Sequence, residues 1–210
     1  MNFRIDLHVH SKYSGDTDAE PEELISHAIA AGMNGIAFTE HYSFRASAPV
    51  ERLREKYEDS ILIVRGVELS AAEGHCLVFG ADTDRLPLSH APLEVIVRVV
   101  NEAGGVVIPS HPFRRGSGIG EALNGIEGIC ALEGYNGANL HAFNARAIEV
   151  AQELKLPFTG GSDAHAPREV GSCYTEFFEV VSSDNLITLL RKGGYRGADA
   201  RKISRGWWPF

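Results

Sequence analysis

The sequence has no long hydrophobic run and begins without a basic segment followed by an apolar one. Its longer apolar stretches, such as residues 95–100, are short and interrupted by Arg98, far below the roughly 18 residues that a membrane span requires. We therefore expect no membrane association. Because the first residues enter a strand-like pattern rather than a secretion signal, we expect a cytoplasmic location.

Cysteine and net positive charge are also scarce. The three cysteines, Cys76, Cys130 and Cys173, form no CxxC pair and lie in apolar segments, so we expect buried, reduced thiols rather than disulfides or metal ligands.

The 20 Lys and Arg residues against 28 Asp and Glu residues give a formal net charge of −8. A surface of that sign repels a phosphate backbone, so we expect no extended nucleic-acid surface.

The 210 residues are 44% hydrophobic and 23% charged, proportions that predict one globular domain over residues 1–210. Strand patterns are expected at 3–9, 35–39, 61–67, 75–79, 106–109, 128–133, 157–160 and 173–181. Helices are expected at 21–31, 49–59, 92–103, 139–154 and 184–191. Strands that alternate with helices in this way predict an α/β fold with a mainly parallel sheet, open or closed.

The placement of the nine histidines is informative because six of them lie at ends of predicted strands. Successive side chains of a strand point to opposite faces, so Asp6, His8 and His10 share one face of the first strand. If the apolar face packs on helices, the two imidazoles point into a barrel interior or a crevice. Neighbouring neutral imidazoles in such a place are typical of a metal site.

Four further strand ends carry ionisable residues. His41, Glu68 and His111 each end or follow a buried strand, and Asp163 and His165 follow another. In a parallel α/β protein these ends lie on one rim, where sites are built. Desolvating so many such groups together is costly without a counter-charge, and imidazoles with carboxylates suit zinc, manganese or iron.

The other histidines have simpler interpretations. His27 lies within a predicted helix and His90 in a turn flanked by proline, so we expect both to be surface or packing residues. His141 stands at a helix start; a structural role is expected, with substrate contact as the alternative.

Five segments in this order resemble the successive motifs of the polymerase and histidinol phosphatase (PHP) family of metal-dependent phosphoesterases. They are Asp6-Leu7-His8-Val9-His10-Ser11, Thr39-Glu40-His41, Gly66-Val67-Glu68, Ser110-His111-Pro112 and Gly161-Ser162-Asp163-Ala164-His165. The related amidohydrolases also begin with HxH but expect a bridging lysine in mid-chain and a single late aspartate.

The resemblance implies a distorted seven-stranded β/α barrel, TIM-like, with up to three divalent metal ions. Manganese, zinc or iron is expected, magnesium less so. The implied ligands are His8, His10, Asp16, His41, Glu68, His75, His111, Asp163 and His165. Many members have an acidic residue one position before Asp16, so Asp18 is an alternative ligand. For His75 the alternative is a histidine that merely starts a strand.

The chemistry implied by the resemblance is hydrolysis of a phosphate ester by a metal-bridging hydroxide. Glu68 is expected to bridge metals, and Asp163 and His165 complete the expected catalytic set. His165 or another histidine of the rim is a candidate proton donor to the leaving oxygen. The expected substrate is a small phosphorylated metabolite or a nucleotide.

Residues near these ligands are candidates for supporting roles. Arg114 is expected to clamp the substrate phosphate, with Arg115 beside it as a second candidate. Both belong to a segment over 114–120 that is rich in glycine and arginine, which we expect to be a mobile loop. Asp6 and Glu40 are expected to orient imidazoles, with Asp6 the stronger candidate. The substrate-reading candidates at the end of the sixth predicted strand are Glu133, Tyr135 and Asn136. The aromatic end of the chain, residues 206–210, is expected to dock on its own domain or on a second subunit.

Two other functions remain open from the sequence. One is hydrolysis of a C–N or carboxylic ester bond by the same metal cluster, which activity on amides or lactones without phosphomonoester turnover would favour. The other is a non-catalytic, metal-stabilised binding module, for which missing ligands would be typical. All nine ligand positions can be filled here, which argues against the module. The sequence does not predict the oligomeric state.

Overall fold

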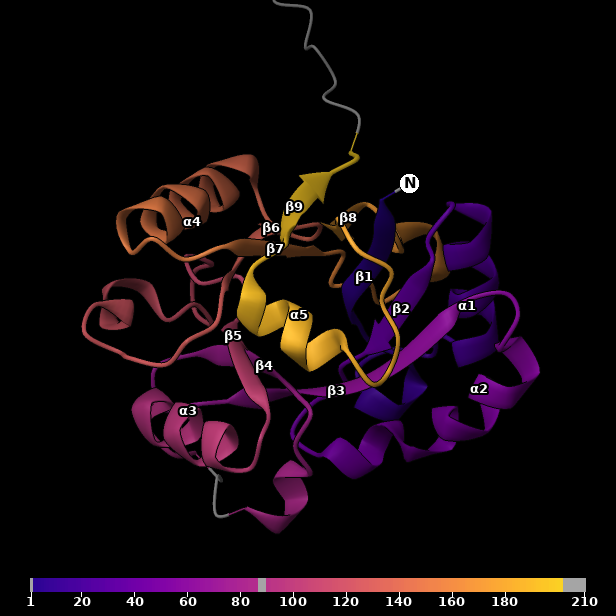
Figure 1. The fold of residues 1–210 in the computed structure, drawn as a ribbon, viewed down its shortest axis with the longest axis horizontal. Coiled ribbons are helices and arrows are strands. Elements are labelled where there is room, and N and C mark those ends of the chain that lie inside the picture. Colours follow the sequence, from indigo (N-terminus) through magenta and orange to yellow (C-terminus); the bar gives the residue numbers. More distant parts are fainter. Residues whose placement is uncertain (1, 87–89, 202–210) are drawn as a thin grey trace, which may run out of the picture.

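Seven strands form one mixed sheet in the computed structural model, which describes residues 2–86 and 90–201 (Figure 1). Their order across the sheet is β5-β4-β3-β2-β1-β8-β9. Their bounds are β1 (Phe3–Val9), β2 (Gly35–Phe38), β3 (Leu62–Ser70), β4 (His75–Phe79), β5 (Val106–Pro109), β8 (Cys173–Phe177) and β9 (Tyr195–Asp199). A second sheet contains the parallel pair β6 (Leu132–Asn136) and β7 (Phe158–Gly161). The expected docking of residues 206–210 falls outside the described residues.

The structure confirms the expected α/β fold in a single domain. The expected seven-stranded β/α barrel is not confirmed, because the sheet is open and mixed. Strands β1, β2 and β3 are parallel, but β3–β4 and β4–β5 are antiparallel. The reason lies in the connection over residues 71–74, because a parallel pair needs a crossover of a dozen or more residues. The pair β6–β7 meets the end of β1 through a bridge between Val9 and Ala164 and a 2.7 Å hydrogen bond from the Asp163 amide to the His8 carbonyl.

The described residues contain five α-helices, four of which contact strands of the seven-stranded sheet while α4 packs on β6. They are α1 (Pro21–Ala30), α2 (Glu51–Tyr57), α3 (Leu93–Glu102), α4 (His141–Glu153) and α5 (Leu186–Lys192). Helix α1 begins on Pro21 with two glutamates in its first turn, and α3 buries Leu93, Ile96, Val97 and Val100, the spacing of one helical face. The helix expected from residue 49 begins two residues later, after a 3-10 segment, Phe44–Val50. Among the described residues no helix is long and apolar enough to cross a membrane.

The rim that carries the histidines is formed despite the mixed directions. Strands β1, β2, β3 and β5 end at this rim, and β4, which runs the opposite way, starts there with His75. His75 pairs with Ser70, two residues after Glu68, and this position at the start of β4 brings its ring to 3.3 Å from the Glu68 carboxylate. Gly161 lets β7 approach β1, because a Cβ at this position would overlap the Cβ of His8.

Candidate metal centre

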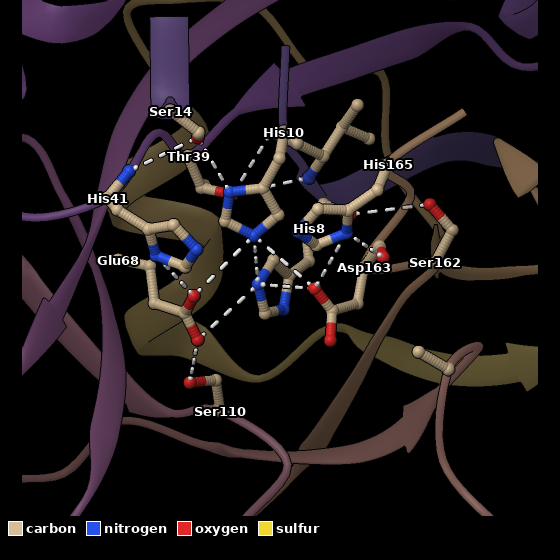
Figure 2. Close-up of polar contacts among 12 residues, drawn as sticks. His8, His10, Ser14, Thr39, His41, Glu68, Ser110, Ser162, Asp163 and His165 are labelled. Atoms are coloured by element: carbon tan, nitrogen blue, oxygen red, sulfur yellow. Dashed lines mark hydrogen bonds and ion pairs between the residues drawn. The ribbon is translucent and has the colours of Figure 1, made fainter. Parts of the chain in front are cut away.

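His8 of β1 and His10, which directly follows this strand, face each other in a completely buried position (Figure 2). The Nε2 atoms of His8 and His10 lie 3.0 Å apart. The other ring nitrogen of each is held by a hydrogen-bond acceptor: His8 Nδ1 lies 2.9 Å from Glu133 Oε1, and His10 Nδ1 lies 3.0 Å from Ser14 Oγ. Because the Ser14 hydroxyl donates to Glu40 at 2.5 Å, its oxygen accepts from His10 Nδ1. Both Nδ1 atoms are therefore donors, and both Nε2 atoms present lone pairs to the same space.

Two lone pairs 3.0 Å apart repel each other unless they share a cation. Without a metal that cation is a proton. Burial opposes a charge on His8, but the carboxylates of Asp163, Glu133 and Glu68 outweigh it and hold the pKa of His8 well above its usual value. Burial lowers the pKa of His10. The pair therefore suits a divalent ion. Such an ion would replace the shared proton, because a histidine must be neutral to bind a metal.

Glu68 lies at the centre of the cluster and is 2% exposed. Its carboxylate oxygens lie within 3.5 Å of five imidazoles, those of His8, His10, His41, His75 and His111, and one accepts a hydrogen bond from Ser110 Oγ at 2.8 Å. Burial opposes its ionisation, but the charge on His8 and hydrogen bonds from other histidines hold the pKa of Glu68 well below its usual value. Glu68 is thus a carboxylate with two oxygens directed to different groups of ligands.

Asp163 closes the other side of the histidine pair. Its Oδ1 lies 3.3 Å from His10 Nε2 and 3.5 Å from His8 Nε2, while its Oδ2 accepts from Arg114 Nη2 at 2.6 Å. Although Asp163 is buried, the charge on His8 and the hydrogen bond from His10 hold its pKa well below the usual value. Its backbone φ of +54° and the +31° of His111 are conformations that non-glycine residues rarely adopt, and such residues are concentrated at functional sites.

A more exposed group of ligands lies beside the buried one. Asp16 Oδ2 lies 2.9 Å from His41 Nε2 and 3.0 Å from His165 Nε2. Since His165 Nδ1 is directed to the Asp163 carbonyl at 3.0 Å, the Nε2 lone pair faces the Asp16 carboxylate, an arrangement that also calls for a shared cation. The side chains of Asp16 and His165 are 40% and 37% exposed. Asp18 is exposed and makes none of these contacts, so the geometry favours Asp16.

All nine residues expected as metal ligands thus meet in one cluster. Four groups of three have ligand atoms close enough to share an ion: His10, His41 and His165; His8, His111 and Asp163; His8, His10 and Glu68; and Glu68, His75 and His111. The buried Nδ1 of His111 has no hydrogen-bond partner among the described residues. A polar atom of this kind is costly to bury unless it is paired. The donor set of imidazoles and carboxylates suits zinc, manganese or iron.

The residues that orient the imidazoles differ from those expected. Asp6 was the stronger candidate, but it touches no imidazole: its oxygens accept from the backbone amides of His8, Ser162 and Gly171. It ties the ligand strand to the ligand loop, and burial raises its pKa to about 6. Glu40 reaches His10 through Ser14, as described above. The orienting partner of His8 is Glu133.

Glu133 and Asn136 were expected to read the substrate, yet both are buried beneath the cluster. Glu133 accepts from His8 Nδ1 with one oxygen and from the His111 amide, at 2.6 Å, with the other. The Asn136 amide donates to Glu133 at 2.9 Å, and its oxygen accepts from Arg114 at 2.7 Å. Their polar atoms are occupied within the protein, so the geometry gives them positioning roles. Tyr135 packs its ring against Phe158.

Arg114 reaches the cluster, whereas Arg115 does not. Arg114 donates to Asn139 Oδ1 at 2.8 Å and to Asp163 at 2.6 Å, and its side chain is 27% exposed. Arg115 is exposed and makes no hydrogen bond or ion pair with another described residue. The loop over 114–120 is tied by backbone hydrogen bonds, including one of 3.0 Å from the His75 amide to Ser117. This bond joins the loop to the start of β4.

Sequence reasoning missed Arg201, which follows β9. Its guanidinium pairs with both oxygens of Asp199 and donates to the carbonyls of Gly137, at 2.9 Å, and Asn139, at 2.6 Å. Arg201 thus supports the turn between β6 and α4, and Asn139 of this turn holds the Arg114 side chain that contacts Asp163. Strand β9 was not expected from the sequence, so no signal placed Arg201 near the cluster.

The remaining cysteines and histidines lie outside the cluster. Cys76 and Cys173 are buried and Cys130 is partly buried, all three as free thiols. Burial raises the pKa of Cys130 to about 12. His141 is largely exposed, with Nδ1 3.3 Å from Arg201 Nη2. Within the described part of the chain, neither His27 nor His90 belongs to a group of ligand atoms that could share an ion.

Comparison with known proteins gives family and fold matches over most of the chain. The model of the PHP domain matches residues 6–115, and the PHP-associated model matches residues 141–195. A histidinol-phosphatase of Lactococcus lactis is 28% identical over 117 residues, which are 50% of this chain and 42% of the relative. An uncharacterized protein of Methanocaldococcus jannaschii is 28% identical over 121 residues, 53% of this chain and 68% of the relative.

Solved structures share the fold at low identity. PsfC from Pseudomonas syringae has a TM-score of 0.73 at 21% identity, with 94% of this chain and 91% of PsfC covered. A proposed metal-dependent phosphoesterase from Bifidobacterium adolescentis has a TM-score of 0.67 at 18% identity, covering 90% and 96% of the two chains. The lesion-specific endonuclease EndoQ from Pyrococcus furiosus has a TM-score of 0.68 at 18% identity, covering 94% of this chain and 58% of the endonuclease.

One of these likenesses corrects an expectation. Endonuclease Q in complex with a 27-mer duplex matches with a TM-score of 0.67 at 17% identity, over 93% of this chain and 58% of the endonuclease. The expectation of no extended nucleic-acid surface, drawn from net charge, is therefore wrong. The physical reason is that net charge averages over the whole surface, whereas the field at a site depends on local charges, including those of bound metal ions.

Proposed function

The chain belongs to the PHP domain family of metal-dependent phosphoesterases, and from this premise we propose that it hydrolyses phosphate esters with divalent metal ions held by the nine clustered side chains. The ligands are those named above, from His8 to His165. The observation that carries the proposal is the pair of facing Nε2 atoms of His8 and His10, 3.0 Å apart, each with its other nitrogen already engaged. Such a pair has little use except to share a cation.

Metal ions bound at these side chains would lower the pKa of a coordinated water and offset the charge of a phosphate ester. Glu68 is the residue that links the ligand groups, because its two oxygens face different histidines. Its low pKa keeps it ionised at neutral pH and available to metals. Replacing it would therefore disturb more than one ion.

Asp163 and Arg114 form the second part of the proposed site. Oδ1 of Asp163 faces the histidine pair while Oδ2 binds Arg114, so the carboxylate fixes the guanidinium at the edge of the cluster. With 27% of its side chain exposed, Arg114 has donors left for a phosphate oxygen, which it would hold through charge-assisted hydrogen bonds. His165, also partly exposed, is the candidate to hold or pass a proton at the leaving oxygen.

The substrate class covers phosphomonoesters and phosphodiesters. The family relative named histidinol-phosphatase favours a small monoester. The likeness to Endonuclease Q, which binds a duplex with an abasic lesion, favours a nucleic-acid diester as a second candidate. The chain spans only 58% of that endonuclease and 42% of the phosphatase, so the two substrates need separate tests.

The test is a metal and substrate panel on the purified chain. The protein is stripped with a chelator, reloaded with manganese, zinc, iron or magnesium, and its metal content is measured by mass spectrometry. Phosphate release from monoesters, cleavage of a bis-aryl phosphodiester and cleavage of an end-labelled DNA duplex with an abasic site are then compared. We expect metal-dependent turnover of at least one phosphate ester.

Two variants sharpen the test. Asp163→Asn should abolish turnover while the fold remains, because the amide cannot supply the same negative oxygen to the cluster. Asp18→Asn, a change of the same kind at an exposed position two residues from Asp16, is the matched control and should keep full turnover. Turnover of amides or lactones without any phosphate ester, or an inert protein under every metal, would overturn the proposal.

A further inference from the structure

A cavity of about 550 Å³ lies next to the metal centre. It is lined by Tyr42, Leu69, Ser70, Thr83, Asp84, Leu86 and His90. Its volume falls within the range of small-molecule sites, roughly 300–1,000 Å³. None of these residues belongs to the metal ligands, so the cavity is a separate feature of the rim.

Two walls of the cavity continue directly from metal ligands. Tyr42 follows His41 in the chain, and Leu69 and Ser70 follow Glu68. The Tyr42 amide donates to the Glu68 carbonyl at 3.0 Å, and the rings of His41 and Tyr42 have centroids 5.4 Å apart. A substrate whose phosphate lies at the cluster would therefore extend its alcohol portion towards this cavity.

The cavity offers a flat apolar surface. The Tyr42 side chain is 67% exposed, and its backbone has a φ of +65°, a conformation that costs free energy in a non-glycine residue. Leu69 and Leu86 add aliphatic walls. An exposed aromatic face beside aliphatic side chains is suited to stacking of a planar ring.

The cavity also offers an unused hydrogen-bonding group. Thr83 is 5% exposed, and its Oγ1 has no hydrogen-bond partner among the described residues. A buried hydroxyl without a partner is unfavourable. Rotation of the Thr83 side chain towards the cavity that it lines would let a ligand with polar atoms on its ring edge pair with it. The Ser70 hydroxyl lies in the same lining.

The charge of the cavity limits what it accepts. Asp84 contributes a carboxylate, which also holds the backbone amides of Phe44 and Arg45 at 3.2 Å and 2.8 Å. The described residues that line the cavity include no lysine or arginine. Arg45 Nε lies 3.8 Å from Asp84 Oδ2, but its side chain is 74% exposed, so solvent screens this pair. A second phosphate or a carboxylate on the substrate therefore finds no buried cation in the described lining.

We propose that this cavity binds an uncharged heteroaromatic ring on the alcohol portion of the phosphate ester, with the ring stacked on Tyr42 and its polar edge on Thr83. The proposal rests on the phosphoesterase function proposed above and adds a substrate class to it. A phosphate ester of a nucleoside is the simplest compound with these features.

The test compares two esters that differ only in the ring. Adenosine 5′-monophosphate and ribose 5-phosphate share the sugar and the phosphate, but only the first has a base. We expect kcat/KM to be about tenfold or more higher for the ester with the base, since stacking of a base on an aromatic residue has an effect of this size. The Tyr42→Ala variant should bring the two values together, and Tyr42→Phe, which keeps the ring, should preserve the difference.

Binding of the nucleoside alone separates this proposal from the function proposed for the metal centre. Adenosine should bind the metal-free protein measurably in calorimetry, whereas ribose should not. Thr83→Val should weaken adenosine binding severalfold without loss of thermal stability, because the hydroxyl it removes makes no hydrogen bond to another described residue.

The outcomes are distinguishable. If both esters are hydrolysed with equal kcat/KM, or if Tyr42→Ala lowers both equally, the ring-binding proposal is overturned while the phosphoesterase function stands. If adenosine binds and Tyr42→Ala abolishes the binding, but no ester is hydrolysed under any metal, the cavity proposal is supported and the proposed hydrolysis fails. Absence of adenosine binding to both metal-free and metal-loaded protein overturns the cavity proposal.

Discussion

Replacing Glu133 by glutamine tests whether the buried layer beneath the cluster controls metal binding. The Glu133 carboxylate accepts three hydrogen bonds, from His8 Nδ1 at 2.9 Å, from the His111 amide at 2.6 Å and from the Asn136 amide group at 2.9 Å. Glutamine has one oxygen and one NH₂ group. Whichever way the amide is turned, a donor faces a donor on one side, and the negative charge that favours His8 Nδ1 as a donor is lost.

The size of the effect follows from these contacts. A buried donor left without an acceptor costs about 1–3 kcal/mol, and loss of a partner that orients a metal-binding histidine typically lowers metal affinity about 10–100-fold. We therefore expect Glu133→Gln to bind zinc or manganese about 10–100-fold more weakly, or about 1.4–2.8 kcal/mol in binding free energy.

The assay is a calorimetric metal titration of the chelator-treated protein, with thermal unfolding recorded on the same sample. Glu121→Gln, at a side chain that is 74% exposed, is the matched control and should leave the affinity unchanged. A Glu133→Gln protein that is folded and binds metal as tightly as the unchanged chain would refute the reasoning.

Three further outcomes follow from the same contacts. The pKa of His8 is raised in the folded chain, so its stabilising contribution is complete below about pH 6.5 and is lost as pH rises through the folded pKa. The melting temperature of the metal-free protein should therefore fall as the pH rises above about 6.5. Addition of metal should release protons into a weak buffer. A melting temperature that does not change with pH, together with no proton release, would contradict this. Because burial raises the pKa of Cys130 to about 12, a disulfide reagent at pH 8 should leave this thiol unmodified until denaturant is added, and rapid labelling of native protein would disagree. Arg201→Ala should lower kcat/KM about tenfold by loosening the turn that holds Arg114. Arg196→Ala, on β9 just before Arg201 and paired with Glu176, should have little effect; equal effects of the two variants would exclude a positioning role.

Strand periodicity accounts for part of the ligand set that the family resemblance implied, whereas Asp16, which lies in no strand, was expected from the resemblance alone. Alternation in β1 puts His8 and His10 on one face, and most of the other ligands come at strand ends that meet at one rim. The same reasoning could not give the direction of β4, which depends on the length of the turn before it. The antiparallel pairs β1–β8 and β8–β9 at the other edge also make the sheet mixed.

The layer beneath the cluster could not be predicted from single residues. Asp6 stands two residues before the ligand His8, whereas Glu133 is 22 positions from His111. Only the pairing of β6 with β7, which lies against β1, brings Glu133 to His8, while Asp6 binds backbone amides. Arg201 depends on contacts with residues more than 60 positions away. Long-range contacts of this kind leave no local periodicity from which to infer them.

The central claim is that the clustered side chains bind divalent metal ions, and a crystal structure of the manganese- or zinc-loaded protein with anomalous scattering data tests it most directly. The account predicts anomalous peaks about 2.0–2.3 Å from ligand atoms of the cluster, with one ion beside the Nε2 atoms of His8 and His10. A fully loaded crystal with no peak within reach of these two atoms would contradict it.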